Sequence, residues 1–233
     1  MMGDQGGSMD PKELFTIQAA LEGLRFSGDG YLVRWKEMPG ESGPPARVVA
    51  ANYSQEQRVY FGDGIDREIE ELIRLLPVQA LLDADHTVFD LLNRQRQVAG
   101  HAIYRTYTAT DTAAIQPCKQ ALRLCSQDER LRGFSEGFFG ISYRDVFAVI
   151  IEGAVVSAAA SSREDETAAE LWVYSHPDYR RQGFAREAAA AWLHSVIGRG
   201  LIPFYSHVTT NEASRHLAES LPLRLCFVLS CYP

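Results

Sequence analysis

The pattern of apolar and polar positions is most regular in the second half of the chain. Short apolar runs, several of them stopped by polar residues, predict strands over residues 101–108, 146–151, 155–161, 169–174, 202–208 and 223–231. Apolar residues at helical spacing predict helices over 184–197, which is rich in alanine, and over 212–221. We therefore expect residues 101–233 to form one domain of strands and helices.

The first hundred residues predict a smaller α+β unit over 11–100, after a flexible leader at 1–10 that contains several glycines. Apolar residues three and four positions apart predict a helix over 11–26. The remaining elements expected in this unit are strands over 31–35, 48–53 and 58–61 and helices over 65–76 and 88–98. None of these segments carries a motif with recognisable chemistry.

A further helix is predicted over 111–124, with Asp111 as its N-cap. Cys118 and Cys125 lie seven residues apart in this pattern, which favours core packing over a metal site or a disulfide. The other two cysteines fall in the last predicted strand, and the four form no CxxC motif. This cysteine usage fits a reducing cytoplasm.

Composition and charge narrow the possible functions. The chain has 233 residues, 46% of them hydrophobic, which is enough for a sizeable core and excludes a disordered chain. Its net charge of −7 argues against binding to duplex nucleic acid through a basic surface. The longest apolar runs are far shorter than the ~20 residues of a membrane helix, and no secretory signal is visible. We expect a cytoplasmic protein without nucleic-acid or membrane partners.

The stretch from Glu170 to Ala191 carries the clearest chemical signal. A predicted strand leads into a short turn, two arginines and Gly183, and then into the alanine-rich helix. The first turn of a helix offers unpaired N–H groups and the positive end of the helix dipole. Gly183 lets a phosphate approach the backbone, and Arg180 and Arg181 add positive charge. This loop is therefore predicted to bind an anion.

The spacing of these residues identifies a family. The chain contains neither the P-loop motif GxxxxGK[ST] nor the dinucleotide motif GxGxxG. It contains R-x-x-G-x-A, at Arg180, Gly183 and Ala185, within the string HPDYRRQGFA. This motif resembles the pyrophosphate loop of the GNAT N-acetyltransferases, and the resemblance covers roughly residues 102–233. It implies the α+β acyl-CoA N-acyltransferase fold, a mixed central sheet flanked by helices, with the N-terminal α+β subdomain of a bacterial subgroup.

The resemblance also implies a set of coenzyme A contacts and no metal site. The strand ending at 173–175 would separate from the strand at 202–208, and the pantetheine arm would enter between them. Beyond the second strand, Asn211, Ala213 and Ser214 match positions that contact the cofactor arm in the family. The full implied set is Val173, Tyr174, Ser175, Arg180, Arg181, Gln182, Gly183, Phe184, Ala185, Arg186, Asn211 and Ser214.

The groups that would move protons are less sharply defined. Many family members place a carboxylate near Glu170 that acts as general base, often through water, so the resemblance implies this role for Glu170. The alternative is an exposed charge at a strand edge. The tyrosine that many members use as general acid is replaced here by Ala218. Other side chains expected near the site are His176, Tyr205, Ser206, His207 and Tyr232.

Together these features predict an enzyme that transfers an acetyl group from acetyl-CoA directly to a primary amine. The acceptor, a small molecule or a peptide, has no signature in the sequence, and the preferred acyl chain has none either. A non-catalytic CoA-binding sensor or interaction module is the alternative. We expect residues 11–100 to shape the acceptor site rather than to bind the cofactor, and a homodimer stays open.

Overall fold

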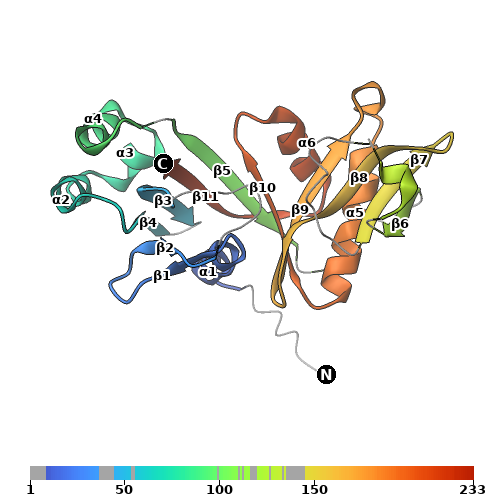
Figure 1. Ribbon diagram of the computed structural model, residues 1–233, viewed down its shortest axis with the longest axis horizontal. Helices are drawn as coiled ribbons and strands as arrows, with labels where there is room; N and C mark the ends of the chain where they lie inside the picture. The colour runs from blue at the N-terminus through green and yellow to red at the C-terminus, as the bar shows by residue number, and fades with distance from the viewer. Residues whose placement is uncertain are drawn as a thin grey trace. The chain divides into compact units, whose positions relative to one another are not determined.

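The computed structural model describes residues 9–36, 45–53, 56–98, 100–109, 111, 113–115, 120–125, 127–132, 134 and 145–233 (Figure 1). The chain divides into two compact units. The first comprises residues 1–103 and 226–233, and the second comprises residues 104–225. Of the leader predicted at 1–10, residues 1–8 lie outside the described residues.

The first unit is built on an antiparallel sheet in which β3 pairs with β4 and with residues 227–232 of β11. Val48, Leu92 and Tyr232 belong to its apolar core and are fully buried. The elements of this unit are α1 (Pro11–Leu21), β1 (Leu24–Phe26), β2 (Leu32–Arg34), β3 (Val48–Tyr53), β4 (Glu56–Phe61), α2 (Arg67–Arg74), α3 (Val78–Leu82), α4 (His86–Gln95) and most of β11 (Arg224–Tyr232).

The helix predicted over 11–26 is shorter in the structure. α1 ends at Leu21, and Gly23 adopts a φ of 73°, in the left-handed region that favours glycine. Residues Leu24–Phe26 then form β1, which pairs antiparallel with β2. The prediction was wrong at Leu24 because one apolar residue after a glycine fits a short strand as well as a helix.

The second unit contains a mixed sheet in the order β5-β10-β9-β8-β7-β6, in which only β9 and β10 are parallel. Among the described residues of this unit, Glu129–Leu131 and Pro177–Tyr179 form 3₁₀ turns. Its strands and helices are β5 (Ala102–Thr108), β6 (Ala121–Cys125), β7 (Asp145–Ile151), β8 (Ala154–Glu164), β9 (Ala168–Ser175), α5 (Phe184–Gly198), β10 (Ile202–Val208) and α6 (Glu212–Ser220).

Helix α5 covers one face of β7, β8 and β9 (Figure 1). Small side chains such as Ala188 and Ala189 on α5 are fully buried and let the helix approach the sheet closely, while Trp192 fills the space beside them. Because strand side chains alternate, Leu171 faces this cluster and Trp172 packs on the opposite face of the sheet. The predicted strands and helices over 146–232 are thus confirmed.

The helix predicted over 111–124 is wrong at its C-terminal end, and residues 112 and 116–119 of that range lie outside the described residues. Residues 121–125 form β6 instead, an edge strand paired antiparallel with β7. Leu122 is 52% exposed and Leu124 is buried, so the backbone pairing with β7, and not the burial pattern, identifies this strand. Cys125 is exposed on this strand, so its predicted place in a helical core is wrong, and Cys118 lies outside the described residues.

The two parallel strands separate along their length. Backbone pairing between β9 and β10 covers only residues 168–170 against 202–204. Beyond that point, residues 171–175 remain paired with β8, and residues 205–208 remain paired with β5. The expected opening between these strands is therefore confirmed, and it begins after the last pair, Glu170 and Phe204.

Candidate functional site

The loop before α5 has an unusual backbone. Gly183, at the N-cap of α5, has a φ of 85°, and Arg181 has a φ of 60°. Residues other than glycine seldom adopt a positive φ, and such strain collects at functional sites. A Cβ atom on Gly183 would meet no other atom within 4 Å, so the space over this glycine is open. The loop thus presents its backbone to an approaching ligand.

The first turn of α5 begins at Phe184 without a side-chain cap, because Gly183 has no side chain. The Glu187 N–H donates to the Gly183 carbonyl at 3.1 Å and closes the first turn. The N–H groups at the very start of a helix, here those of Phe184 and Ala185, point out of the helix end, where the helix dipole is positive. This arrangement suits a negatively charged ligand.

Two exposed arginines precede the helix. The Nε group of Arg180 donates to the Ser175 carbonyl at 3.3 Å, which ties the loop to the end of β9. The Gln182 side chain donates to the Asp178 carbonyl at 3.4 Å. Within the described residues neither Arg180 nor Arg181 forms an ion pair with a carboxylate. Both charges are therefore available to an anion, and Arg186 is exposed one turn further on.

The end of β9 is held in place by β8. Ser157 is fully buried, and its hydroxyl donates to the Tyr174 carbonyl at 3.1 Å and lies 2.7 Å from the Ser175 hydroxyl. Val173 packs against the apolar cluster beneath α5. Tyr174 stacks on Trp172 with their ring centroids 6.3 Å apart. Sequence reasoning missed Ser157, since only the strand register that sets it opposite Ser175 reveals its role.

The start of α6 lies after the open end of β10. Asn211 caps this helix, and its Oδ1 accepts from the Ser214 N–H at 3.1 Å, while Ala213 is exposed beside it. Tyr205 on β10 is 4% exposed. Burial raises the pKa of the Tyr205 phenol. The nearby Ser214 side chain lowers this pKa and so offsets part of the rise.

Glu170 is buried, so the alternative of an exposed edge charge is wrong. It is 5% exposed, and its Oε2 lies 2.5 Å from Arg163 Nη1. A register shift between Ser161 and Arg163 makes Ser162 an extra residue in β8 and brings Arg163 opposite Glu170. Arg163 was missed from the sequence because a bulge of this kind changes which residue faces Glu170.

The other side chains expected near the site differ in their hydrogen-bond partners. His176 is exposed, and its Nδ1 accepts from the Asp178 N–H at 3.4 Å. The Ser206 hydroxyl lies 3.1 Å from that of Thr106. Tyr232 belongs to the first unit, where its hydroxyl donates to the Leu81 carbonyl at 2.5 Å. Its proton is therefore engaged in a core hydrogen bond.

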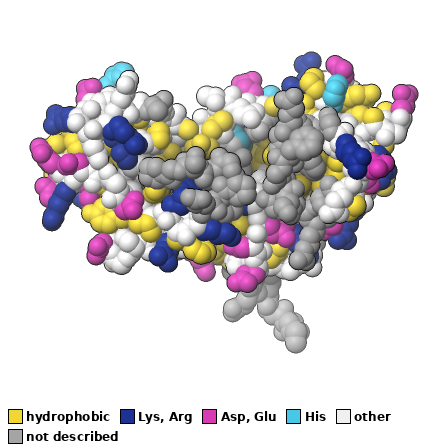
Figure 2. Space-filling view, in the orientation of Figure 1, with side chains coloured by type: hydrophobic (Ala, Val, Ile, Leu, Met, Phe, Trp, Pro, Cys, Tyr) yellow, Lys and Arg dark blue, Asp and Glu magenta, His cyan; other side chains and the backbone are white. Residues whose placement is uncertain are grey.

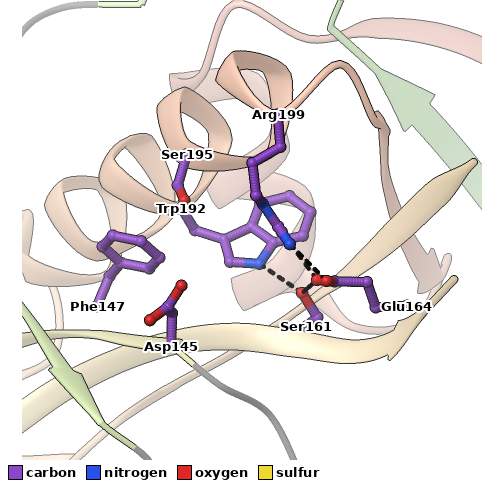
Figure 3. Close-up of a pocket in the computed structure, with 7 residues that line it drawn as sticks. All are labelled: Asp145, Phe147, Ser161, Glu164, Trp192, Ser195 and Arg199. Carbon is purple, nitrogen blue, oxygen red and sulfur yellow. Dashed lines mark hydrogen bonds and ion pairs between the residues drawn. The ribbon is translucent and has the colours of Figure 1, made fainter. Parts of the chain in front are cut away.

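A small pocket lies near the C-terminal end of α5 and has room for about one water molecule. It is lined by Asp145, Phe147, Ser161, Glu164, Trp192, Ser195 and Arg199 (Figure 3). Several of its polar groups bond to one another. Trp192 Nε1 donates to Ser161 at 3.1 Å, and Ser161 donates to Glu164 at 2.7 Å. Arg199 donates twice to Glu164, at 2.5 and 2.9 Å. We interpret it as a structural network.

Three other kinds of functional feature were sought among the described residues: a metal site, a membrane-spanning helix and a strongly charged surface. No group of three or more His, Cys, Asp or Glu residues lies close enough to hold a metal ion in the described ranges. None of the described helices is long and apolar enough to cross a membrane. On the face shown in Figure 2, acidic and basic side chains are interspersed. The loop at 180–186 and the opening between β9 and β10 are therefore the strongest candidates for the functional site.

Comparison with known proteins assigns the family. The family model described as GNAT acetyltransferase matches residues 100–232, more than half of the chain. The chain therefore belongs to the GNAT acetyltransferase family, and its fold is the α+β arrangement of that family, preceded by an N-terminal region. No curated protein matches the sequence.

Several solved structures are similar to this chain at low identity. A GNAT-family protein from Novosphingobium aromaticivorans is 19% identical over 58% of this chain and 65% of that chain, just under two thirds of its length, with a TM-score of 0.46. A GNAT-family acetyltransferase from Colwellia psychrerythraea is 12% identical over 97% of both chains, with a TM-score of 0.49. A GCN5-related N-acetyltransferase from Kribbella flavida is 11% identical over 98% and 97%, with a TM-score of 0.47.

Proposed function

We propose that this chain is an acetyl-CoA-dependent N-acetyltransferase that transfers an acetyl group directly to a primary amine. The loop at 180–186 is the observation that carries the proposal. It combines an open glycine in the left-handed conformation, an uncapped helix start and two arginines that have no carboxylate partner among the described residues. A pyrophosphate needs backbone N–H donors and positive charge together, and this loop offers both.

In this proposal the loop and the opening hold successive parts of the cosubstrate. The N–H groups of Gly183, Phe184 and Ala185 bind the pyrophosphate, with Arg180, Arg181, Gln182 and Arg186 around it. The pantetheine arm lies between β9 and β10, against backbone groups of residues 173–175 on one side. Asn211 and Ser214 flank it at the start of α6. All of these residues belong to the second unit, residues 104–225.

The end of β9 supplies the groups nearest the reacting centre. Along a strand, N–H groups point alternately to the two sides, so some N–H groups of residues 171–175 face the opening instead of β8. These donors would stabilise negative charge on the thioester carbonyl oxygen as the amine attacks. Holding the amine and the thioester together removes much of the entropic barrier.

We also propose that Glu170 accepts the proton of the incoming ammonium group through a water molecule. Three features support this role. Glu170 lies at the last position where β9 and β10 pair, next to the opening. It is buried, and Arg163 fixes its carboxylate in place.

The proposed binding of pyrophosphate by the loop at 180–186 can be tested by substituting two glycines that have similar backbone conformations but lie at opposite ends of α5. Gly183 and Gly200, just beyond the C-terminal end of α5, have φ values of 85° and 78°, and a Cβ on either would meet no atom within 4 Å. Valine at either position is strained to a similar degree, by roughly 1–2 kcal/mol. We expect Gly183→Val to weaken acetyl-CoA binding by at least about tenfold and Gly200→Val to leave it unchanged.

Titration calorimetry with acetyl-CoA measures this difference, and thermal melting checks that the two variants lose similar stability. Equal affinities in the two variants would contradict the phosphate loop. Release of free thiol in the presence of a panel of primary amines then tests transfer itself. Tight acetyl-CoA binding without thiol release from any amine would favour a CoA-binding sensor, for which the replacement of the family tyrosine by Ala218 is the motivation.

A further inference from the structure

Three alternate residues of β9 form a row on one face of the sheet. Leu171 and Val173 pack against the apolar cluster beneath α5, so Glu170, Trp172 and Tyr174 point to the opposite face. The alternation in β9 is unbroken, because the extra residue at the register shift belongs to β8. The row therefore begins with the proposed proton acceptor and continues with two aromatic rings, at intervals of roughly 6.5 Å.

The two rings lie at the border of the opening between β9 and β10. On the other side of β9, the β8 residues that pair with Trp172 and Tyr174 are Ala160 and Ala158, so the side chains beside the rings on that strand are methyl groups. Pairing with β10 ends at Phe204, before either ring is reached. Both rings are half-buried, so part of each remains accessible to a ligand.

The orientation of the rings is fixed by their neighbours. The planes of Trp172 and Tyr174 are inclined by only 15°, with centroids 6.3 Å apart. Phe134 meets Tyr174 nearly edge-on, at 84° and a centroid distance of 5.3 Å. Aromatic rings attract one another in both arrangements, so each ring holds the next in place. Trp172 and Tyr174 thus form a flat apolar surface that is ordered before a ligand binds, which reduces the entropy lost on binding.

We propose that Trp172 and Tyr174 bind the body of the amine acceptor, and that the preferred acceptor is a primary amine carrying a flat aromatic group. This inference rests on the proposed function and on the role proposed for Glu170. The amine end of the acceptor lies toward Glu170, and the next two positions of the row are uncharged rings. Stacking on these rings favours an aromatic body over a saturated one of equal size.

The charges on this face argue against a diamine as the preferred acceptor. Arg163 lies opposite Glu170 and balances its charge. A second ammonium group on the acceptor would therefore lose hydration over the two rings without gaining an unpaired carboxylate in return. An aromatic group buries apolar area on the same surface and leaves no polar group unsatisfied.

The test compares three amines at saturating acetyl-CoA, with thiol release as the signal. The amines are 2-phenylethylamine, 2-cyclohexylethylamine and 1,5-diaminopentane. They differ in basicity as well as in shape, so the quantity compared between proteins is the ratio of their kcat/KM values, in which basicity cancels. Because stacking acts equally before and during the reaction, a change in this ratio should arise mainly from KM.

Four full-length proteins are compared: the unmodified chain, Trp172→Leu, Trp172→Phe and Tyr107→Leu. The leucine variant at 172 keeps an apolar side chain without a ring, and the phenylalanine variant keeps a ring. Tyr107 is the matched control, since it is half-buried and packs against the cluster on the α5 side of the sheet. Trp172→Leu should lower the ratio of the aromatic amine to each of the others by about fivefold. The other two variants should keep both ratios within about twofold.

Each result decides for or against the proposal. Thiol release with ratios unchanged in Trp172→Leu would overturn the aromatic acceptor and leave the proposed function standing. If only the ratio of the aromatic to the saturated amine falls, the rings bind the diamine equally well, and the preference is wrong. If no amine releases thiol from the unmodified chain, the proposed function fails and this inference fails with it. Tyr174→Leu provides the same comparison if Trp172→Leu does not fold.

Discussion

The two faces of the β8–β9 hairpin carry ion pairs of nearly the same length. On one face Arg163 Nη1 lies 2.5 Å from Glu170 Oε2, and on the other Arg199 Nη1 lies 2.5 Å from Glu164 Oε1. Arg163 and Glu164 are adjacent in β8, so their side chains leave the strand on opposite faces. A single strand thus contributes one partner to each pair.

The surroundings of the two pairs differ. Glu164 also accepts from Ser161, which in turn accepts from Trp192 Nε1, so this network joins α5 to the sheet (Figure 3). Glu170 lies where β9 and β10 stop pairing. The length of an ion pair therefore says little about its role. Its position beside an opening or beneath a helix separates a functional candidate from a structural one.

The largest expected effect concerns Glu170. Replacing it with glutamine should lower turnover by about 10²-fold, because the carboxylate that accepts the ammonium proton is lost. The affinity for acetyl-CoA should hardly change. Steady-state kinetics with a responsive amine, measured from pH 6 to 9, should show the lower turnover throughout this range. Turnover equal to that of the unmodified chain across this range would remove Glu170 from the mechanism.

A charge-swapped double variant separates the two roles of that residue. Arg163→Glu combined with Glu170→Arg restores an ion pair with its polarity reversed. If Glu170 only holds the hairpin together, the double variant should recover both stability and turnover. We expect it to recover part of the melting temperature lost in the single variants and none of the turnover.

Glu164→Gln is the matched variant on the other face, with a smaller expected effect. It removes a partly buried charge that Arg199 and Ser161 both contact. We expect a loss of about 1 kcal/mol of stability, or roughly 2–4 °C in melting temperature for a chain of this size. Acetyl-CoA affinity and turnover should not change, because this network is remote from the loop at 180–186. If Glu164→Gln lowers turnover without lowering stability, the Arg199–Glu164 pair is not merely structural, and the contrast with the Arg163–Glu170 pair is wrong.

The smallest effect is expected for a third ion pair, between Arg123 on β6 and Asp145 on β7. It has two hydrogen bonds of 2.7 Å, yet the Arg123 side chain is 67% exposed. Exposed pairs contribute little because water screens them. Arg123→Ala should change the free energy of unfolding by about 0.5 kcal/mol or less, measured by urea denaturation. A larger loss would show that geometry outweighs exposure in this sheet.

Much of the second unit could be predicted from its sequence, and the reasons are local. Short runs of apolar residues mark β7, β8 and β9, and the alanine-rich run marks α5, because in each case the pattern matches the burial. β6 was missed because Leu124 fits both a helical and an alternating pattern. Only pairing with β7, whose partner residues begin at 145, decides between them.

In the candidate site too, some features could be predicted from adjacent residues and others could not. The loop around Gly183 could be picked out because its motif occupies a few adjacent residues, and the positive φ of that glycine is a feature that the structure adds. Arg163 and Ser157 could not be, since their roles come from strand register and burial. These properties involve residues distant in sequence.

The extra residue in β8 makes the position of a charge depend on chain length. Ser162 interrupts the ladder, and its hydroxyl donates to the Glu170 carbonyl at 3.1 Å. A chain one residue shorter through loss of Ser162 would have an uninterrupted ladder and still set Arg163 opposite Glu170. Loss of Arg163 instead would set Ser162 there and leave the carboxylate without its cation. Deletion of Ser162 should therefore be tolerated, whereas deletion of Arg163 should be damaging. Both deletions remove a single codon from the same stretch.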